Sequence, residues 1–218
     1  TVYPVASCND KDFQNLMDVY LDGVFHPSIY REPKIFKQEG WHYELPSEDA
    51  PLTVNGVVYN EMKGAFSSPE SVLERFTSSV LFPDTPYSNE SGGDPAVIPN
   101  LSYEQFIQFH KDYYHPANSY IYLYGDMDME EKLLWLDKEY LSAYDKKDFT
   151  LDSSIALQKP FTEPVEKETT YSVTANEGTE DNTYLSLNTV VGTDTDPILY
   201  VAFQILDYTL ISAPGAPL

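Results

Sequence analysis

Cysteine is almost absent from the chain: Cys8 is the only one in 218 residues, so no disulfide can form within it. A single thiol suits a reducing compartment, and no base partner lies near Cys8 in the sequence. We therefore interpret Cys8 as a small buried residue rather than a nucleophile. Long apolar runs are also missing, since none approaches the roughly 20 residues that a membrane helix needs. The sequence thus predicts neither a disulfide scaffold nor a membrane span.

Basic residues are scarce as well. The chain carries 13 Lys and Arg against 35 Asp and Glu, a formal net charge of −22. Such a surface would repel the phosphate backbone of a nucleic acid and the headgroups of anionic membranes, so neither is expected as a partner. An acidic field can attract basic peptides, or it can serve solubility alone. Solubility is the favoured interpretation from the sequence.

Several catalytic signatures are missing too. The sequence holds no His-x-x-Glu-His or His-Glu-x-x-His motif, no Gly-x-Ser-x-Gly elbow and no phosphate loop. His110 and His115 are five residues apart, about 140° around a helix, and cannot hold one ion together from a regular helix. These two histidines, with His26 and His42, are therefore predicted to be structural. No pair of acids stands out as a glycosidase would require.

The residues that are present favour a packed α+β protein. Hydrophobic residues make up 42% of the chain, with 18 Tyr and 11 Phe. Apolar spacing and capping residues predict helices at about 10–24, 33–41, 69–81, 102–113, 128–144 and 196–211. Apolar or alternating runs predict strands at 1–7, 54–59, 119–124, 168–175 and 182–191. This mixture predicts an α+β fold.

The order of these elements suggests two units. The first runs through residues 1–148, and residues 149–164 lose the pattern and are expected to be a linker. The second, 165–218, has two strands and one helix, which is too little for a stable sheet domain. Both ends are therefore expected to be cuts in a longer chain.

Glu61 is the carboxylate with the most distinctive surroundings. It follows the apolar run Val57-Val58-Tyr59 and is expected to be partly buried. A buried carboxylate needs a partner charge, a set of hydrogen bonds or a metal ion. From the residues alone, a salt bridge with Lys or Arg is favoured over a metal.

A family resemblance extends this interpretation. The stretch 56–64, Gly-Val-Val-Tyr-Asn-Glu-Met-Lys-Gly, resembles the segment that supplies the third zinc ligand in presequence-protease-type metallopeptidases. These belong to the pitrilysin/insulysin superfamily, whose zinc-binding motif is the inverted form, His-x-x-Glu-His. Further stretches fit the same branch in the same order: 3–7, 11–16, 38–45, 91–95, 113–118 and 124–126. The likeness covers most of residues 1–126, and beyond them it rests on order and pattern.

The resemblance implies a fold and an activity. The family's catalytic domain is α+β, with an antiparallel sheet and flanking helices, repeated four times along roughly 1,000 residues, far beyond one domain. Two halves enclose a chamber that admits unfolded peptides, and two His and one Glu hold zinc. By this resemblance Glu61 is the ligand glutamate, residues 1–148 end the catalytic domain, and residues 165–218 begin a second homologous domain.

The sequence departs from the family in one respect. The His-x-x-Glu-His motif is expected upstream of Thr1, so zinc is predicted to be held by the parent protein and not by this chain alone. The chain is therefore predicted to be an inactive fragment of a zinc metalloendopeptidase, with the other parent domains and unfolded peptides as partners. The expected compartment is the cytoplasm, with an organelle matrix as the alternative. The alternative is a non-catalytic scaffold or peptide-binding subunit of the same superfamily.

Overall fold

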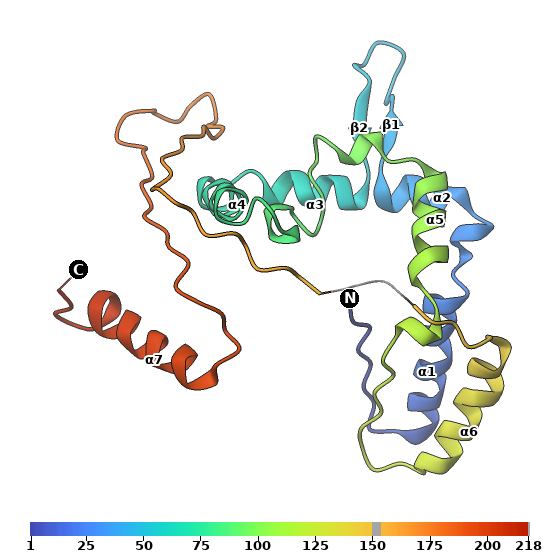
Figure 1. Ribbon diagram of the computed structural model, residues 1–218. Coiled ribbons are helices and arrows are strands. Elements are labelled where there is room, and N and C mark those ends of the chain that lie inside the picture. Colours follow the sequence, from blue (N-terminus) through green and yellow to red (C-terminus); the bar gives the residue numbers. More distant parts are fainter. Residues whose placement is uncertain (150–153, 218) are drawn as a thin grey trace.

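The computed structural model describes residues 1–149 and 154–217, and it confirms the α+β class (Figure 1). Seven α-helices and one two-stranded antiparallel sheet are found in this described part of the chain. The helices are α1 Asp10–Phe25, α2 Pro33–Ile35, α3 Val57–Ala65, α4 Pro69–Leu81, α5 Tyr103–Tyr113, α6 Met129–Glu139 and α7 Pro197–Asp207. The strands are β1 His42–Glu44 and β2 Thr53–Asn55.

The predicted helices all form, and side chains at their starts explain where they begin. The Asn9 carboxamide accepts a hydrogen bond from the Asp12 amide at the start of α1. At α5, Ser102 and Gln105 form the predicted capping box. Each of these bonds satisfies an amide that the helix itself cannot pair. Short π-helical turns extend α2 to Gly40 and α7 to Ser212, close to the predicted helix ends.

The main core lies between α1 and α6, which run side by side in Figure 1. Phe25 of α1 packs with Leu136 and Tyr140 of the α6 end. The Tyr140 hydroxyl donates to the backbone oxygen and the carboxylate of Asp18, at 2.8 and 2.7 Å. Burial, followed by this bond to Asp18, raises the pKa of Tyr140. The Lys132 ammonium is almost fully buried and lies 2.9 Å from the Asp10 carboxylate. This ion pair joins the N-terminal ends of α1 and α6.

A hairpin precedes the helix that carries Glu61. Strands β1 and β2 pair with His42 opposite Asn55 and Glu44 opposite Thr53. The sequence predicted a strand over 54–59, and this prediction is wrong beyond residue 55. Gly56 breaks the strand at φ +152°, and α3 begins at Val57. Glu61 therefore lies within a helix and not after a strand.

Four other predicted strands, at 1–7, 119–124, 168–175 and 182–191, are not formed in the described residues. A strand needs a neighbour that completes its ladder of hydrogen bonds. No described segment provides one. Tyr120 and Tyr122 are consequently left almost fully exposed, at 105% and 84%. The prediction for Cys8 is also wrong, because its side chain is exposed.

Helix α7 lies apart from the helices of the first 149 residues (Figure 1). The segment before α7 contacts the first part of the chain, through a reciprocal pair of hydrogen bonds between Gln158 and Asp84, at 3.0 and 2.8 Å, and a bond of 3.5 Å from the Tyr184 hydroxyl to Glu70 of α4. Apart from Gln204 and Asp207, the residues of helix α7 are apolar, and its side chains are exposed. No helix in the described ranges is long and apolar enough to cross a membrane.

Candidate functional site

Glu61 lies on the second turn of α3 with its side chain exposed. Within the described part of the chain it makes no hydrogen bond and no ion pair, so the predicted partial burial and salt bridge are wrong. Val57 and Val58, one turn earlier, share its face of the helix and are 52% and 38% exposed. The buried side of α3 is instead the side of Met62. The carboxylate is thus free on an open, partly apolar helix face.

Gly56 sets the direction in which α3 starts. A Cβ atom added there would lie 2.3 Å from the Gly40 carbonyl oxygen and 2.7 Å from the Trp41 Cα. Both distances are far below van der Waals contact, and the φ of +152° is one that side chains rarely allow. Only glycine lets the start of α3 cross the chain before β1 this closely.

Asn55 connects the hairpin to the first turn of α3. Its side-chain carbonyl oxygen accepts from the Gly56 amide at 2.8 Å and from the Asn60 side chain at 2.6 Å. Its own NH₂ group donates to the Glu44 carboxylate at 2.8 Å. Hydrogen bonds therefore link Glu44 to Asn55 and Asn55 to Asn60, which is the residue before Glu61.

The side of α3 that carries Met62 packs against a glycine-containing loop between α4 and α5. Met62 is buried, and a Cβ atom added to Gly92 would lie 2.3 Å from the Met62 sulfur. Gly93 follows at φ +92°. The loop over 91–95, which resembled a family motif, thus supports the helix from the side of Met62, about 100° around the helix axis from Glu61.

Arg75 of α4 fixes the other end of α3. Its guanidinium donates to the carbonyl oxygen of Ala65, the last residue of α3, and to that of Ser71 at 2.8 Å. It also pairs with Glu90 at 3.0 Å and lies 3.7 Å from the ring centre of Phe66. The positive charge of Arg75 at this position also interacts favourably with the negative, C-terminal end of the α3 dipole.

The chemistry of Glu61 fits one metal-ligand position, since a carboxylate oxygen is a common zinc ligand. In the described ranges, no three or more His, Cys, Asp or Glu side chains gather where they could hold a metal ion. Three of the histidines, His26, His110 and His115, pack against aromatic rings, and His42 Nδ1 lies 2.7 Å from the Lys37 carbonyl oxygen. His110, for example, is buried, with Nε2 2.8 Å from the Val24 carbonyl and Nδ1 2.7 Å from the Tyr30 hydroxyl.

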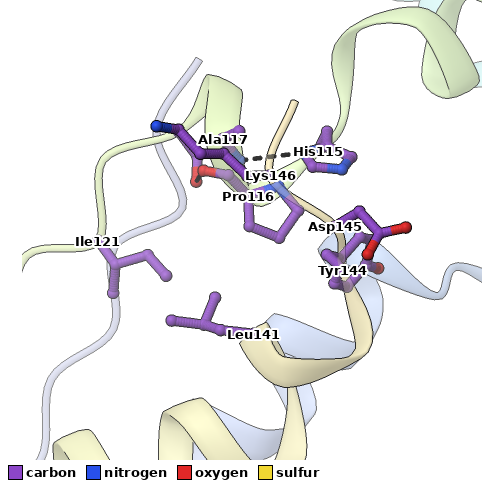
Figure 2. A pocket seen from close by; sticks show the side chains of 9 residues that line it. His115, Pro116, Ala117, Ile121, Leu141, Tyr144, Asp145 and Lys146 are labelled. Carbon is purple, nitrogen blue, oxygen red and sulfur yellow. Dashed lines mark hydrogen bonds between the residues drawn. The ribbon is translucent and has the colours of Figure 1, made fainter. Parts of the chain in front are cut away.

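A hollow of about 420 Å³ lies away from Glu61, between residues 115–121 and 141–146 (Figure 2). Ile121 and Leu141 point into it, and its walls are mostly apolar. His115, at its edge, accepts a hydrogen bond from the Ala117 amide at 3.1 Å. Its imidazole therefore caps the start of the 3₁₀ turn Pro116–Asn118 that follows α5, which is a structural role, as predicted.

Comparison with known proteins identifies the family. A family model described as the peptidase M16 inactive domain matches residues 100–218. The chain belongs to the M16 peptidase family. Protein HypA of Clostridium perfringens is 51% identical over all of this chain and 22% of its own length. Presequence protease 1, chloroplastic/mitochondrial, of Arabidopsis thaliana is 42% identical over all of this chain and 20% of its own length. The mitochondrial presequence protease of Mus musculus is 37% identical, with 21% of its length covered.

These relatives confirm the resemblance to presequence-protease-type members of the M16 family. The chain spans between 20% and 22% of the three relatives' lengths. The M16 inactive-domain match begins at residue 100 and does not include Glu61. The chain therefore matches one segment of these longer M16 relatives.

Sequence reasoning did not find Asn55, Arg75 or the seat of Met62 on Gly92. The Asn55-Gly56 dipeptide was a usable signal, because Asn-Gly marks a turn and so predicts the end of a strand. Arg75 offered no signal, since its partners lie in two helices and a loop that only the fold brings together.

Proposed function

We propose that this chain is part of a zinc-dependent M16 peptidase, in which Glu61 is one of the metal ligands. The observation that carries the proposal is the free carboxylate of Glu61 on the open face of a helix that is fixed at both ends. The two His ligands and the general base would come from a His-x-x-Glu-His motif outside these 218 residues. The names of the relatives from Arabidopsis and mouse, both presequence proteases, support a peptidase.

Each part of the helix would have its own task. Zinc, when bound, would polarise the scissile carbonyl and lower the pKa of a bound water. Glu61 would supply one oxygen ligand, and its charge would offset part of the charge of the ion. Val57 and Val58 would keep the neighbouring surface apolar, which strengthens the electrostatic interactions of the carboxylate once water is excluded.

The domain division also remains a proposal. Residues 1–148 would end the catalytic domain, residues 149–164 would link, and residues 165–218 would begin a second homologous domain. The separation of α7 from the first helices supports this division. The exposed apolar surface of α7 would then be covered by the rest of that second domain.

Unfolded peptides are the proposed substrates, degraded inside a chamber that the other domains of the parent would close. The net charge of −22 suits peptides with basic residues. The proposed compartment is the cytoplasm or an organelle matrix. The Arabidopsis and mouse relatives carry organelle names, which supports the second possibility for proteins of this type.

The test uses the full-length protein that contains this chain. Glu61→Gln should lower bound zinc from about one per molecule to well below one, and peptide cleavage should fall with it, because one of three ligands is lost. Glu74→Gln on α4, a change of the same kind at another exposed glutamate, should leave both at the wild-type level. Full zinc occupancy in the Glu61→Gln protein would refute the proposal.

A non-catalytic scaffold or peptide-binding subunit is the second candidate. The family model that matches residues 100–218 is described as an inactive domain, and this observation favours it for that part of the chain. The two functions differ in the full-length protein with and without a chelator. Cleavage that the chelator abolishes supports the peptidase, whereas peptide binding without cleavage, unchanged by the chelator, supports the scaffold.

A further inference from the structure

The Glu61 carboxylate has no hydrogen-bond partner in the described residues that would orient it on α3. Metal-ligating side chains are usually oriented by a hydrogen bond to a neighbouring group. Glu61 has no such bond within the described residues, so the position of α3 sets the region that its carboxylate can reach. The distances in a metal site are narrow, within about 0.2 Å of their ideal values. The contacts that fix α3 therefore bear directly on the proposed ligand.

The first contact is at the N-terminal end of α3. No side chain caps the helix at Gly56 itself. Asn55, one residue earlier, binds the start of the helix in another way, because its side-chain carbonyl oxygen accepts from both the Gly56 amide and the Asn60 side chain. Its NH₂ group is anchored on Glu44 of β1. Asn55 thereby connects the β1–β2 hairpin to the turn of α3 that carries Glu61.

The second contact is at the C-terminal end. Arg75 holds the Ala65 carbonyl with one nitrogen, the Ser71 carbonyl with another and Glu90 with a third. These partners belong to α3, α4 and the following loop. The planar guanidinium bonds all three at once, which a lysine ammonium on its flexible stem cannot reproduce.

We propose that Asn55 and Arg75 are positioning residues for Glu61, which together prevent the nine-residue helix α3 from tilting on its Met62 seat. The inference rests on the proposed function of Glu61 as a ligand. It goes further, because it assigns a role in metal retention to two residues that lie outside the ligand set. Held at one end only, α3 could swing and carry the carboxylate away from its place.

The test measures zinc binding to the full-length protein by competition with a chelator. Asn55→Asp keeps the acceptor for Gly56 and Asn60 but places a second carboxylate against Glu44, so zinc binding should weaken about tenfold. Adding Glu44→Gln supplies an amide that can donate to the carboxylate introduced at position 55, and the double variant should recover most of the loss. Arg75→Lys should also weaken zinc binding about tenfold, because its fork of donors is lost.

A control separates positioning from general loss of stability. Tyr140→Phe removes the bonds to Asp18 in the α1–α6 core, far along the chain from α3. It should lower the melting temperature of the metal-free protein and leave zinc affinity unchanged. Equal weakening of zinc binding by Tyr140→Phe, or unchanged zinc affinity in both Asn55→Asp and Arg75→Lys, would overturn the inference. No recovery in the Asn55→Asp/Glu44→Gln double variant would overturn it for Asn55.

Glu61→Gln, measured in the same series, keeps this inference distinct from the proposed function. Zinc retained in Glu61→Gln would refute the ligand role itself. Zinc lost in Glu61→Gln but retained in Asn55→Asp and Arg75→Lys would refute only the positioning role.

Discussion

Gly56 shows how one residue can determine the course of the chain near the candidate ligand. Its backbone lies against Gly40 and Trp41, and it separates the strand residue Asn55 from the helix residue Val57. A side chain cannot occupy this crossing without displacing one of the two segments. The conformation of a single residue thus decides whether Glu61 follows a strand or lies within a helix.

Gly56→Ala should therefore destabilise the protein, by about 1–3 kcal/mol from backbone strain alone and by more from the clash with Gly40. Gly64→Ala, in the same helix but with nothing within 4 Å of an added Cβ, should instead stabilise it by about 0.5–1 kcal/mol. Urea unfolding followed by tryptophan fluorescence measures both, since Trp41 lies at the crossing. A neutral Gly56→Ala variant would contradict the close approach.

Tyrosines in the α1–α6 region give the fold a sensitivity to alkaline pH. The pKa of Tyr140 is raised by burial and by Asp18, and burial also raises the pKa of Tyr144. A raised folded-state pKa means that the folded protein holds the phenolic proton more tightly than the unfolded chain. The resulting stabilisation is present below the ordinary tyrosine pKa of 10.0 and is lost as the pH rises above it.

The free energy of unfolding should accordingly fall above pH 10, and Tyr140→Phe should make this fall shallower, because phenylalanine cannot ionise. Urea unfolding at about pH 8 and at about pH 10.5, on either side of the ordinary tyrosine pKa, compares the two proteins directly. Parallel losses in wild type and Tyr140→Phe would show that Tyr140 is not responsible.

At the scale of elements, helices and strands behave differently in this chain. Each predicted helix forms because its hydrogen bonds lie within its own segment. The segment 119–124 lacks a ladder partner among the described residues, and its tyrosines face outward. The hollow in Figure 2 lies beside the same segment, at Ile121. We expect a neighbouring strand of the longer protein to complete this region.

Hydrogen exchange tests that expectation. In the isolated 218-residue chain, amides of residues 120–124 should exchange far faster than those of α5, whose amides are bonded within the helix. In the full-length protein the same amides should become protected, because the expected neighbouring strand would bond them there. Equal protection of 120–124 in both proteins would contradict the assignment of this segment as an unpaired strand.

At the scale of the whole molecule, residues 1–149 and 154–217 carry a candidate ligand, Glu61, but no cluster of three or more potential metal ligands. A carboxylate alone does not hold zinc with structural affinity. The isolated chain should therefore retain well under one zinc per molecule after dialysis, whereas the full-length protein should retain about one. Zinc analysis of the two proteins, with Glu61→Gln as the matched variant, decides this. Stoichiometric zinc in the isolated chain would mean that the ligand assignment is wrong.

The amino-acid sequence by itself determined the helices other than α3, several of their caps and the family resemblance, because these depend on neighbouring residues and local motifs. The capping box of Ser102 and Gln105 is one example, and the M16 family shown by the comparisons is another. The role of Glu61 as a ligand was also predicted from the sequence, and it stays a prediction until the zinc measurements are made.

Only the tertiary structure decided how Glu61 is presented. The sequence predicted a partly buried carboxylate after a strand, whereas the fold places it exposed on α3. The reason is physical: the close crossing at Gly56 and the bonds of Arg75 join segments that are distant in the sequence, and no local pattern records them. For the strands the reason is the same, since a ladder exists only where a second segment supplies its other half.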